Sequence, residues 1–172
     1  FPVLDGNCMV DYSFLADSII AAAGNGPKAL CGWVSREIEY LSGNWGEDPG
    51  YSPRNPVETL EERSGVCRDR TVLLLWLLRR AGYDPSAILT SSSGSLRTYP
   101  GSRSFDHMLV ALEDTCGETI FLDPTNDFSP QGYTYTLRGE RYLPLTLSGS
   151  PLRYFPNDRI GDTLSILIEG SV

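Results

Sequence analysis

A cysteine at the expected start of a helix is the first residue whose position suggests chemistry. Cys67 follows a Ser64-Gly65 break and precedes a strongly apolar stretch, which predicts that it lies at a helix N-terminus. Unpaired backbone N–H groups and the positive end of the helix dipole meet there, which favours a nucleophilic thiolate and could hold an oxyanion. The competing interpretation is that Cys67 merely packs, which is what we expect of Cys8, Cys31 and Cys116.

The chain has a single histidine, so a side-chain base that titrates near neutrality must be His107. His107 lies in the segment Phe105–Leu112, whose two faces are both mostly apolar, as in a strand that is covered on each side. A lone histidine on such a strand is usually a core residue. The next predicted strand makes a functional role more attractive, because it ends in the carboxylate of Asp123.

A polar turn near Thr115 joins these two predicted strands. If the hairpin is symmetric about Thr115, the numbers of paired residues sum to 230, and His107 then faces Asp123 directly. Opposite residues in an antiparallel pair place their Cβ atoms about 4.5–5.5 Å apart on one face. A carboxylate at that distance can orient an imidazole through a hydrogen bond.

Two other aspartates lie close to His107 or Asp123 in the sequence. Asp127 is the fallback if the hairpin is offset, whereas Asp106 is expected to point away from His107 on its own strand. The competing interpretation of Asp123-Pro124-Thr125 is a turn that ends a strand. Taken together, however, a thiol, an imidazole and a carboxylate in these positions are the nucleophile, base and orienter of an amide-attacking enzyme.

Helices are predicted to position the thiol. Val10–Ala23 and a segment from Pro27 to Gly43 have helical spacing and are expected to form a helical hairpin. Asn55-Pro56-Val57-Glu58 combines an N-cap, a proline at the first helical position and a capping-box glutamate, which predicts a short helix to about Arg63. The helix that starts near Cys67 should run to Ala81, and its middle is apolar on every face, so it is predicted to be buried all round.

Strands are predicted to carry the base and the orienter. Helices first and strands after indicate an α+β fold, with a helical part of about 1–82 and an antiparallel sheet over about 83–172 packed on the central helix. Residues 1–172 have the length of a single domain, and the chain can be a fragment of a longer protein. The predicted strands are Ala87–Thr90, Phe105–Leu112, Thr119–Asp123, Tyr133–Leu137, Tyr142–Leu147 and Thr163–Ile168.

Composition excludes several classes of function. The formal charge of −8, without a basic stripe, argues against a nucleic-acid partner. The longest apolar run, Val72–Leu78, is far shorter than the roughly 20 residues that span a bilayer. The cysteine spacing and the single histidine give no support for a metal site, so no metal and no cofactor are expected. The chain starts at Phe1 without a leader, which suggests a mature or trimmed product; an extracytoplasmic location is slightly favoured, and the oligomeric state stays open.

The residues around the three candidate groups resemble the transglutaminase-like superfamily, a branch of the papain-like cysteine enzymes. Gly65-Val66-Cys67-Arg68-Asp69 is similar to the family's Gly-x-Cys-x-Asp segment, Phe105–Val110 resembles its histidine strand, and Phe121–Thr125 its aspartate segment. The chain looks most like bacterial members of unknown substrate. The resemblance implies Cys67 as nucleophile, His107 as general base and then acid, and Asp123 as orienter.

The resemblance also implies a reaction. We expect cleavage of a peptide-like amide in a peptide or protein substrate through a thioester, with hydrolysis favoured over transamidation. The oxyanion is expected to bind the Cys67 backbone N–H and a second donor, for which Trp45 and Tyr51 are candidates. The alternative is a catalytically inactive module that keeps the fold and binds a protein partner.

Overall fold

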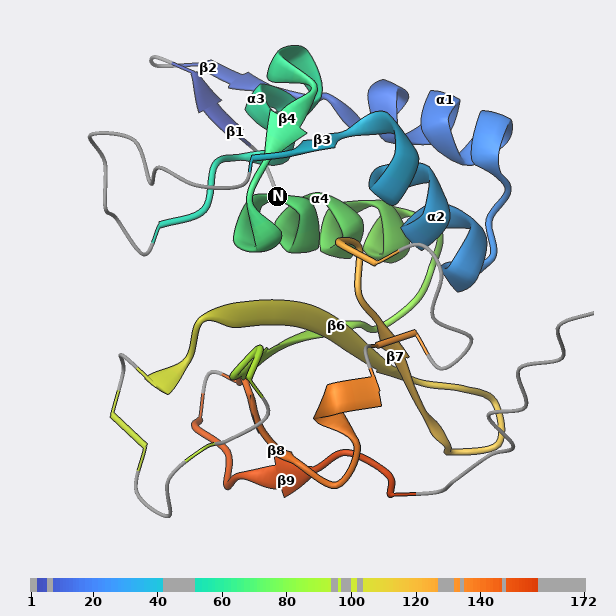
Figure 1. The fold of residues 1–172 in the computed structure, drawn as a ribbon. Helices are drawn as coiled ribbons and strands as arrows, with labels where there is room; N and C mark the ends of the chain where they lie inside the picture. Colours follow the sequence, from blue (N-terminus) through green and yellow to red (C-terminus); the bar gives the residue numbers. More distant parts are fainter. Residues whose placement is uncertain are drawn as a thin grey trace, which may run out of the picture.

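The fold consists of a helical layer that covers one face of a β-sheet (Figure 1). In the computed structural model, the described residues are 3–5, 8–41, 52–93, 96, 100–101, 104–126, 132–133, 135–146 and 148–157. The helices are α1 (Ser13–Ala23), α2 (Pro27–Glu37), α3 (Pro56–Glu62) and α4 (Cys67–Arg80), with a 3₁₀ turn η2 (Tyr135–Leu137). The strands are β1 (Val3–Asp5), β2 (Cys8–Val10), β3 (Glu39–Tyr40), β4 (Ser64–Gly65), β5 (Ser86–Thr90), β6 (His107–Glu113), β7 (Thr119–Leu122), β8 (Arg141–Pro144) and β9 (Arg153–Tyr154).

The main sheet has the strand order β7-β6-β5-β8-β9, and all its pairings are antiparallel. Two smaller sheets lie outside it. β1 pairs with β2, and β3 pairs in parallel with β4, which places Tyr40 beside Gly65 just before the thiol. Helices in the first part of the chain and a largely antiparallel sheet in the second confirm the predicted α+β class.

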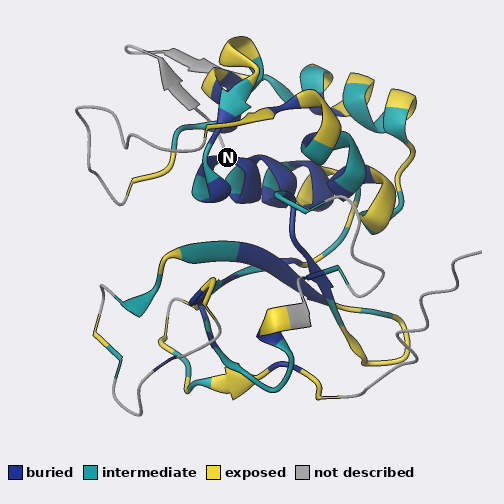
Figure 2. Cartoon of the chain, in the orientation of Figure 1, coloured by how far each residue is buried: buried dark blue, intermediate teal, exposed yellow. Residues whose placement is uncertain are grey.

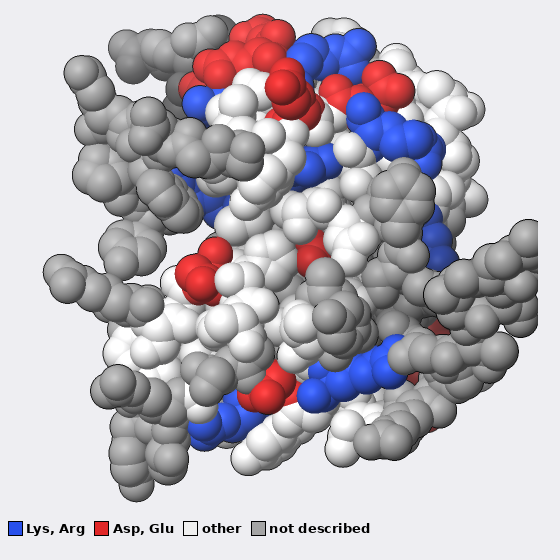
Figure 3. Space-filling view, viewed as in Figure 1, with Lys and Arg blue, Asp and Glu red and all other residues white. Residues whose placement is uncertain are grey.

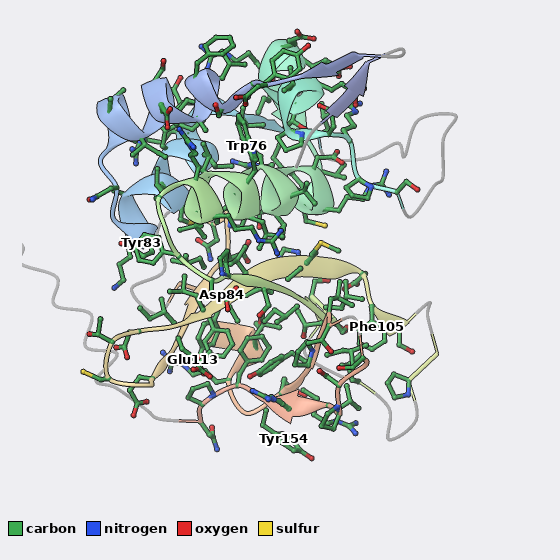
Figure 4. The ribbon with its side chains drawn as sticks, turned by 180° about the vertical axis from the view of Figure 1, so that it is seen from behind. Trp76, Tyr83, Asp84, Phe105, Glu113 and Tyr154 are labelled. Carbon is green, nitrogen blue, oxygen red and sulfur yellow. The ribbon has the colours of Figure 1, made fainter. Side chains whose placement is uncertain are left out.

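Helix α4 is the centre of the molecule, as its apolar sequence predicts. It lies between the other helices and the sheet, and Figure 2 shows both α4 and the facing part of β6 as largely buried. Trp76 points from α4 towards the helices on the side away from the sheet (Figure 4). Each fully buried leucine contributes about 1.5–3 kcal/mol relative to an exposed one, so this helix supplies much of the core. Its buried leucines are Leu73, Leu74, Leu75, Leu77 and Leu78.

The far face of the sheet is covered by an aromatic cluster. Phe121, Tyr133, Tyr142 and Phe155 belong to one buried group with Leu137, and five pairs of their rings have centroids 4.8–5.5 Å apart. The prediction of a strand over Tyr133–Leu137 is wrong for this reason. Within that segment, residues 135–137 form the 3₁₀ turn, and Tyr133 and Leu137 cover the sheet instead of extending it.

Other element boundaries differ from the prediction in smaller ways. The second helix ends at Glu37 and not near Gly43, because Ile38 is already extended and leads into β3. The first helix begins at Ser13, since Val10 belongs to β2. The short strands β1, β2, β3, β4 and β9 were not predicted, and the expected strand Thr163–Ile168 lies outside the described residues. Among the helices that are described, none has the length and apolarity needed to cross a membrane.

Candidate active site

Cys67 is the first residue of α4, and the side chain of Asp69 fixes the backbone just before it. Asp69 is buried, and its Oδ2 accepts the Val66 N–H at 3.1 Å while its Oδ1 accepts the Arg54 N–H at 3.0 Å. One carboxylate therefore ties the turn before Cys67 to the segment before α3. Gly65 permits this approach, because a Cβ there would lie 2.9 Å from the Cβ of Asp69.

Two side chains of α4 fix the helix against its neighbours. The Thr71 hydroxyl donates to the Met108 carbonyl at 2.9 Å, so the helix that carries Cys67 is bonded to the strand that carries His107. On the other side, the buried guanidinium of Arg70 donates to the carbonyls of Val34 and Ser35 at 3.1 and 2.6 Å, near the C-terminal end of α2.

His107 and Asp123 are hydrogen-bonded, although the register differs from the predicted one. The hairpin pairs Val110 with Leu122 and Glu113 with Thr119, so paired numbers sum to 232 and not to 230. The turn is centred on Cys116 because the Asp114 carboxylate accepts N–H groups from Cys116 and Glu118, with Gly117 at a φ of +82°. The direct pairing of His107 with Asp123 was therefore wrong.

The two side chains meet all the same. A shift of two residues leaves each residue on the same face of the sheet, so the pair becomes diagonal and not opposite. The His107 Nε2–H donates to Asp123 Oδ2 at 2.8 Å. The Asp123 backbone N–H, in turn, donates to the Gly132 carbonyl at 2.7 Å, which fixes the residue just after β7.

The imidazole of His107 also lies close enough to the Cys67 side chain for the two groups to interact. Burial lowers the pKa of His107, but the hydrogen bonds to Asp123 and Cys67 and the charges of both groups outweigh burial and raise that pKa to about 10. The Sγ of Cys67 lies 4.0 Å from the Asp106 carbonyl oxygen, at the start of the same strand.

Asp123 is almost fully buried but favours its ionised form. Burial raises the pKa of its carboxyl, whereas the hydrogen bond and charge of His107 and two donors from Thr125 lower it, and the lowering prevails. The Thr125 N–H and hydroxyl donate to Asp123 Oδ1 at 2.9 and 2.6 Å. The two carboxylate oxygens therefore have separate tasks, one towards His107 and one towards Thr125.

The remaining predicted site residues have mixed outcomes. The Asp106 carboxylate accepts the N–H and hydroxyl of Ser92 at 2.6 and 2.9 Å, in agreement with the prediction that it does not serve His107. Asp127, Trp45 and Tyr51 lie outside the described residues. Cys31 is buried as expected, but Cys116 is exposed in the β6–β7 turn, where a polar sequence leaves nothing to cover it; the side chain of Cys8 is not among those described.

The sequence reasoning missed Tyr40, which lies beside these groups. Burial raises the pKa of the Tyr40 phenol and the charges of Cys67 and Asp123 raise it further, while the Arg70 guanidinium, 5.8 Å from the ring centroid, opposes them. A strand of two residues has no periodicity that could have placed Tyr40 there. Thr125 was also given no role, although its position two residues after an aspartate is a recognisable turn signal.

An open pocket of about 710 Å³ adjoins this group of residues. It lies between the end of α2, strand β3 and the residues after Asp123, and it is lined by Tyr40, Arg63, Arg70, Thr125 and Asn126, among others. Acidic and basic side chains are interspersed over the helical layer on the face shown in Figure 3. A second pocket, of about 380 Å³, lies at the far end of β6, where Figure 4 shows Asp84 and Glu113 remote from Phe105.

Comparison with known proteins supports the fold. One solved structure, a proposed protease from Parabacteroides distasonis, has a TM-score of 0.62 at 18% identity over 86% of this chain; the chain spans only 28% of that protein. Calcium-bound LapG from Legionella pneumophila has a TM-score of 0.50 at 15% identity, over 89% of this chain and 80% of LapG. At these identities the likeness shows a shared fold.

The sequence itself matches a family model. No curated protein has a significant match to the chain. Residues 15–98 match the model described as the transglutaminase-like superfamily, a range that includes Cys67 and ends before His107 and Asp123. Residues 15–98, just under half of the chain, are therefore similar in sequence to the transglutaminase-like superfamily, as the motif around Cys67 predicted.

Proposed function

We propose that the protein is a cysteine acyl-transfer enzyme that cleaves a peptide-like amide, with hydrolysis favoured over transamidation. The observation that carries this proposal is the hydrogen bond between the Asp123 carboxylate and His107, whose imidazole lies close enough to the Cys67 side chain to interact with it. The transglutaminase-like match, and the fold shared with a proposed protease, support the same reaction class.

The first half of the reaction forms a thioester. A Cys67 thiolate, paired with protonated His107, attacks the carbonyl carbon, and the carbonyl π electrons move to oxygen as the C–S bond forms. The Cys67 backbone N–H has no acceptor within α4, because it belongs to the first turn, so it is available to the oxyanion together with one further donor. When the oxyanion collapses, the C–N bond breaks and the leaving amine takes the proton from His107.

The second half returns the enzyme to its starting state. Neutral His107 accepts a proton from water as the water oxygen attacks the thioester carbon. Collapse of this second intermediate breaks the C–S bond, releases the carboxylic acid and restores the thiolate beside a protonated His107. Asp123 keeps the ring oriented and stabilises its positive charge through both halves.

Capture of the thioester tests the proposal. Wild-type protein incubated with glutamine- or peptide-amide probes should gain the acyl mass on the peptide that contains Cys67, and hydroxylamine should remove it. Cys67→Ala should gain nothing, whereas Cys116→Ser, which removes an exposed thiol in the turn of the hairpin, should be acylated like the wild type. A wild type that no amide or ester probe acylates would instead favour the inactive binding module.

A further inference from the structure

Thr125 stands out because it contacts the orienting carboxylate twice. Both its N–H and its hydroxyl donate to Oδ1 of Asp123, the oxygen that does not serve His107. Asp123 is 1% exposed, so water cannot replace these donors freely. Hydrogen bonds to a buried charged group are stronger than those between neutral groups, and a carboxylate with one oxygen held in this way cannot rotate away from its partner.

We propose that Thr125 is a positioning residue of the reaction, which fixes the Asp123 carboxylate in the ionised and oriented state that holds His107 beside the thiol. The inference rests on the proposed function, because Thr125 acts only through Asp123 and His107. It assigns to Thr125 a task that neither the sequence motif nor the fold assigns. The backbone N–H fixes the turn, and the hydroxyl supplies the second donor.

The geometry of the turn makes this task specific to a β-hydroxyl. The Asn126 N–H donates to the Asp123 carbonyl at 3.1 Å, so the backbone after Asp123 folds back on it and brings position 125 next to Oδ1. A serine at this position retains the hydroxyl, whereas a valine has nearly the same shape without it. The pair of substitutions therefore separates the donor from the volume of the side chain.

The ionisable groups near Asp123 come from three elements. His107 on β6 bonds Oδ2, Cys67 lies beyond His107 at the start of α4, and the Tyr40 phenol on β3 is close enough to interact with the charges of Cys67 and Asp123. All these groups are common to the wild type and the variants at position 125. Two further charges close to Tyr40 are also unchanged, Arg70 and Asp106.

The sign of the expected pH effect follows from the donors. A hydrogen bond donated to a carboxylate stabilises the ionised form, so loss of the hydroxyl makes Asp123 easier to protonate. The negative charge of Asp123 supports protonated His107. As the pH falls, Thr125→Val would lose this charge at a higher pH than the wild type does. In Thr125→Val, the acid limb of Cys67 alkylation should therefore move to higher pH.

The experiment measures alkylation of Cys67 by iodoacetamide as a function of pH, with the Cys67 peptide identified by mass, so no substrate is needed. We expect Thr125→Val to shift the acid limb upward and Thr125→Ser to restore the wild-type limb. Thr119→Val, on the exposed edge of β7, should leave it unchanged and so controls for an added valine. The unfolding midpoint of each variant confirms that it is folded under the assay conditions.

The outcomes separate this proposal from the proposed function. A wild type whose Cys67 reacts slowly, with the profile of an ordinary thiol, contradicts the active site itself. A reactive wild type whose acid limb is identical in Thr125→Val contradicts only the role of Thr125. An equal shift in Thr125→Val and Thr125→Ser would also overturn that role, since it would show that the methyl group and not the hydroxyl matters.

Discussion

At the scale of single residues, the site contains two charges that are buried and depend on each other. His107 is 13% exposed and Asp123 is 1% exposed at the side chain, and each holds the other's pKa in favour of the charged form. Charges that lie this deep contribute to stability only while both remain ionised and paired. The stability of the fold and the protonation state of the site are therefore linked.

This linkage gives a prediction with a definite sign. His107 has its pKa raised from 6.5 to about 10, so its contribution to stability is fully present below pH 6.5 and is lost as the pH rises towards 10. Urea unfolding of wild type and His107→Gln should therefore differ most near pH 6. The difference in unfolding free energy should shrink towards pH 10, by on the order of 3 kcal/mol. A difference that stays constant with pH would show that His107 is not charged in the folded protein.

At the scale of elements, Gly132 packs so closely against β7 that there is no room for a side chain at this position. A Cβ at Gly132 would lie 1.8 Å from the Phe121 carbonyl oxygen, and Gly132 has a φ of +78°. The same residue accepts the Asp123 N–H, so the backbone here supports the carboxylate. Any side chain at position 132 must push this segment away from the strand that precedes Asp123.

Gly132→Ala should therefore destabilise the protein by about 2 kcal/mol or more, since it combines a backbone clash with a left-handed conformation. The measurement is the urea midpoint with an unchanged slope. Gly101→Ala is a matched control, because nothing lies within 4 Å of its Cβ position and its φ is not in the left-handed region; it should change stability by no more than about 0.5 kcal/mol. Equal effects in the two variants would contradict the close approach at Phe121.

The sequence predicted elements well where they are long or end in strong local signals. The capping box of Asn55 and Glu58 is present as expected, and α4 runs from Cys67 to Arg80 with Gly82 just beyond. The expected contact between His107 and Asp123 is present although the predicted register is wrong, because a shift of two residues leaves each side chain on the same face of its strand. The sequence could not predict β3 or β9, since strands of two residues have no periodicity. It could not predict the position of Tyr133 either, because a buried aromatic side chain is as common on a strand as in a segment that packs over a sheet.

At the scale of the whole molecule, the thiol and the imidazole belong to different layers. Cys67 is on the central helix and His107 is on the sheet, so their contact depends on the packing between α4 and β6 (Figures 1 and 2). The Thr71 hydroxyl bonds the Met108 carbonyl across this interface. Leu78 is seven residues further along the helix and hence on nearly the same face as Thr71.

Leu78→Ala should test whether this interface is the source of global stability. Leu78 is fully buried, and removal of its side chain should leave a cavity that costs about 2–5 kcal/mol in unfolding free energy. Leu145→Ala, at a leucine that is 42% exposed, should cost no more than about 0.5 kcal/mol. Because the cavity lies towards the far end of the helix from Cys67, the folded fraction of Leu78→Ala should keep the wild-type pH profile of Cys67 alkylation. The contrary result is a Leu78→Ala variant that is fully folded but no longer has the wild-type pH profile of Cys67 alkylation. That result would mean that the packing of the whole of α4 on the sheet keeps Cys67 beside His107, and not only the contacts at the first turn of the helix.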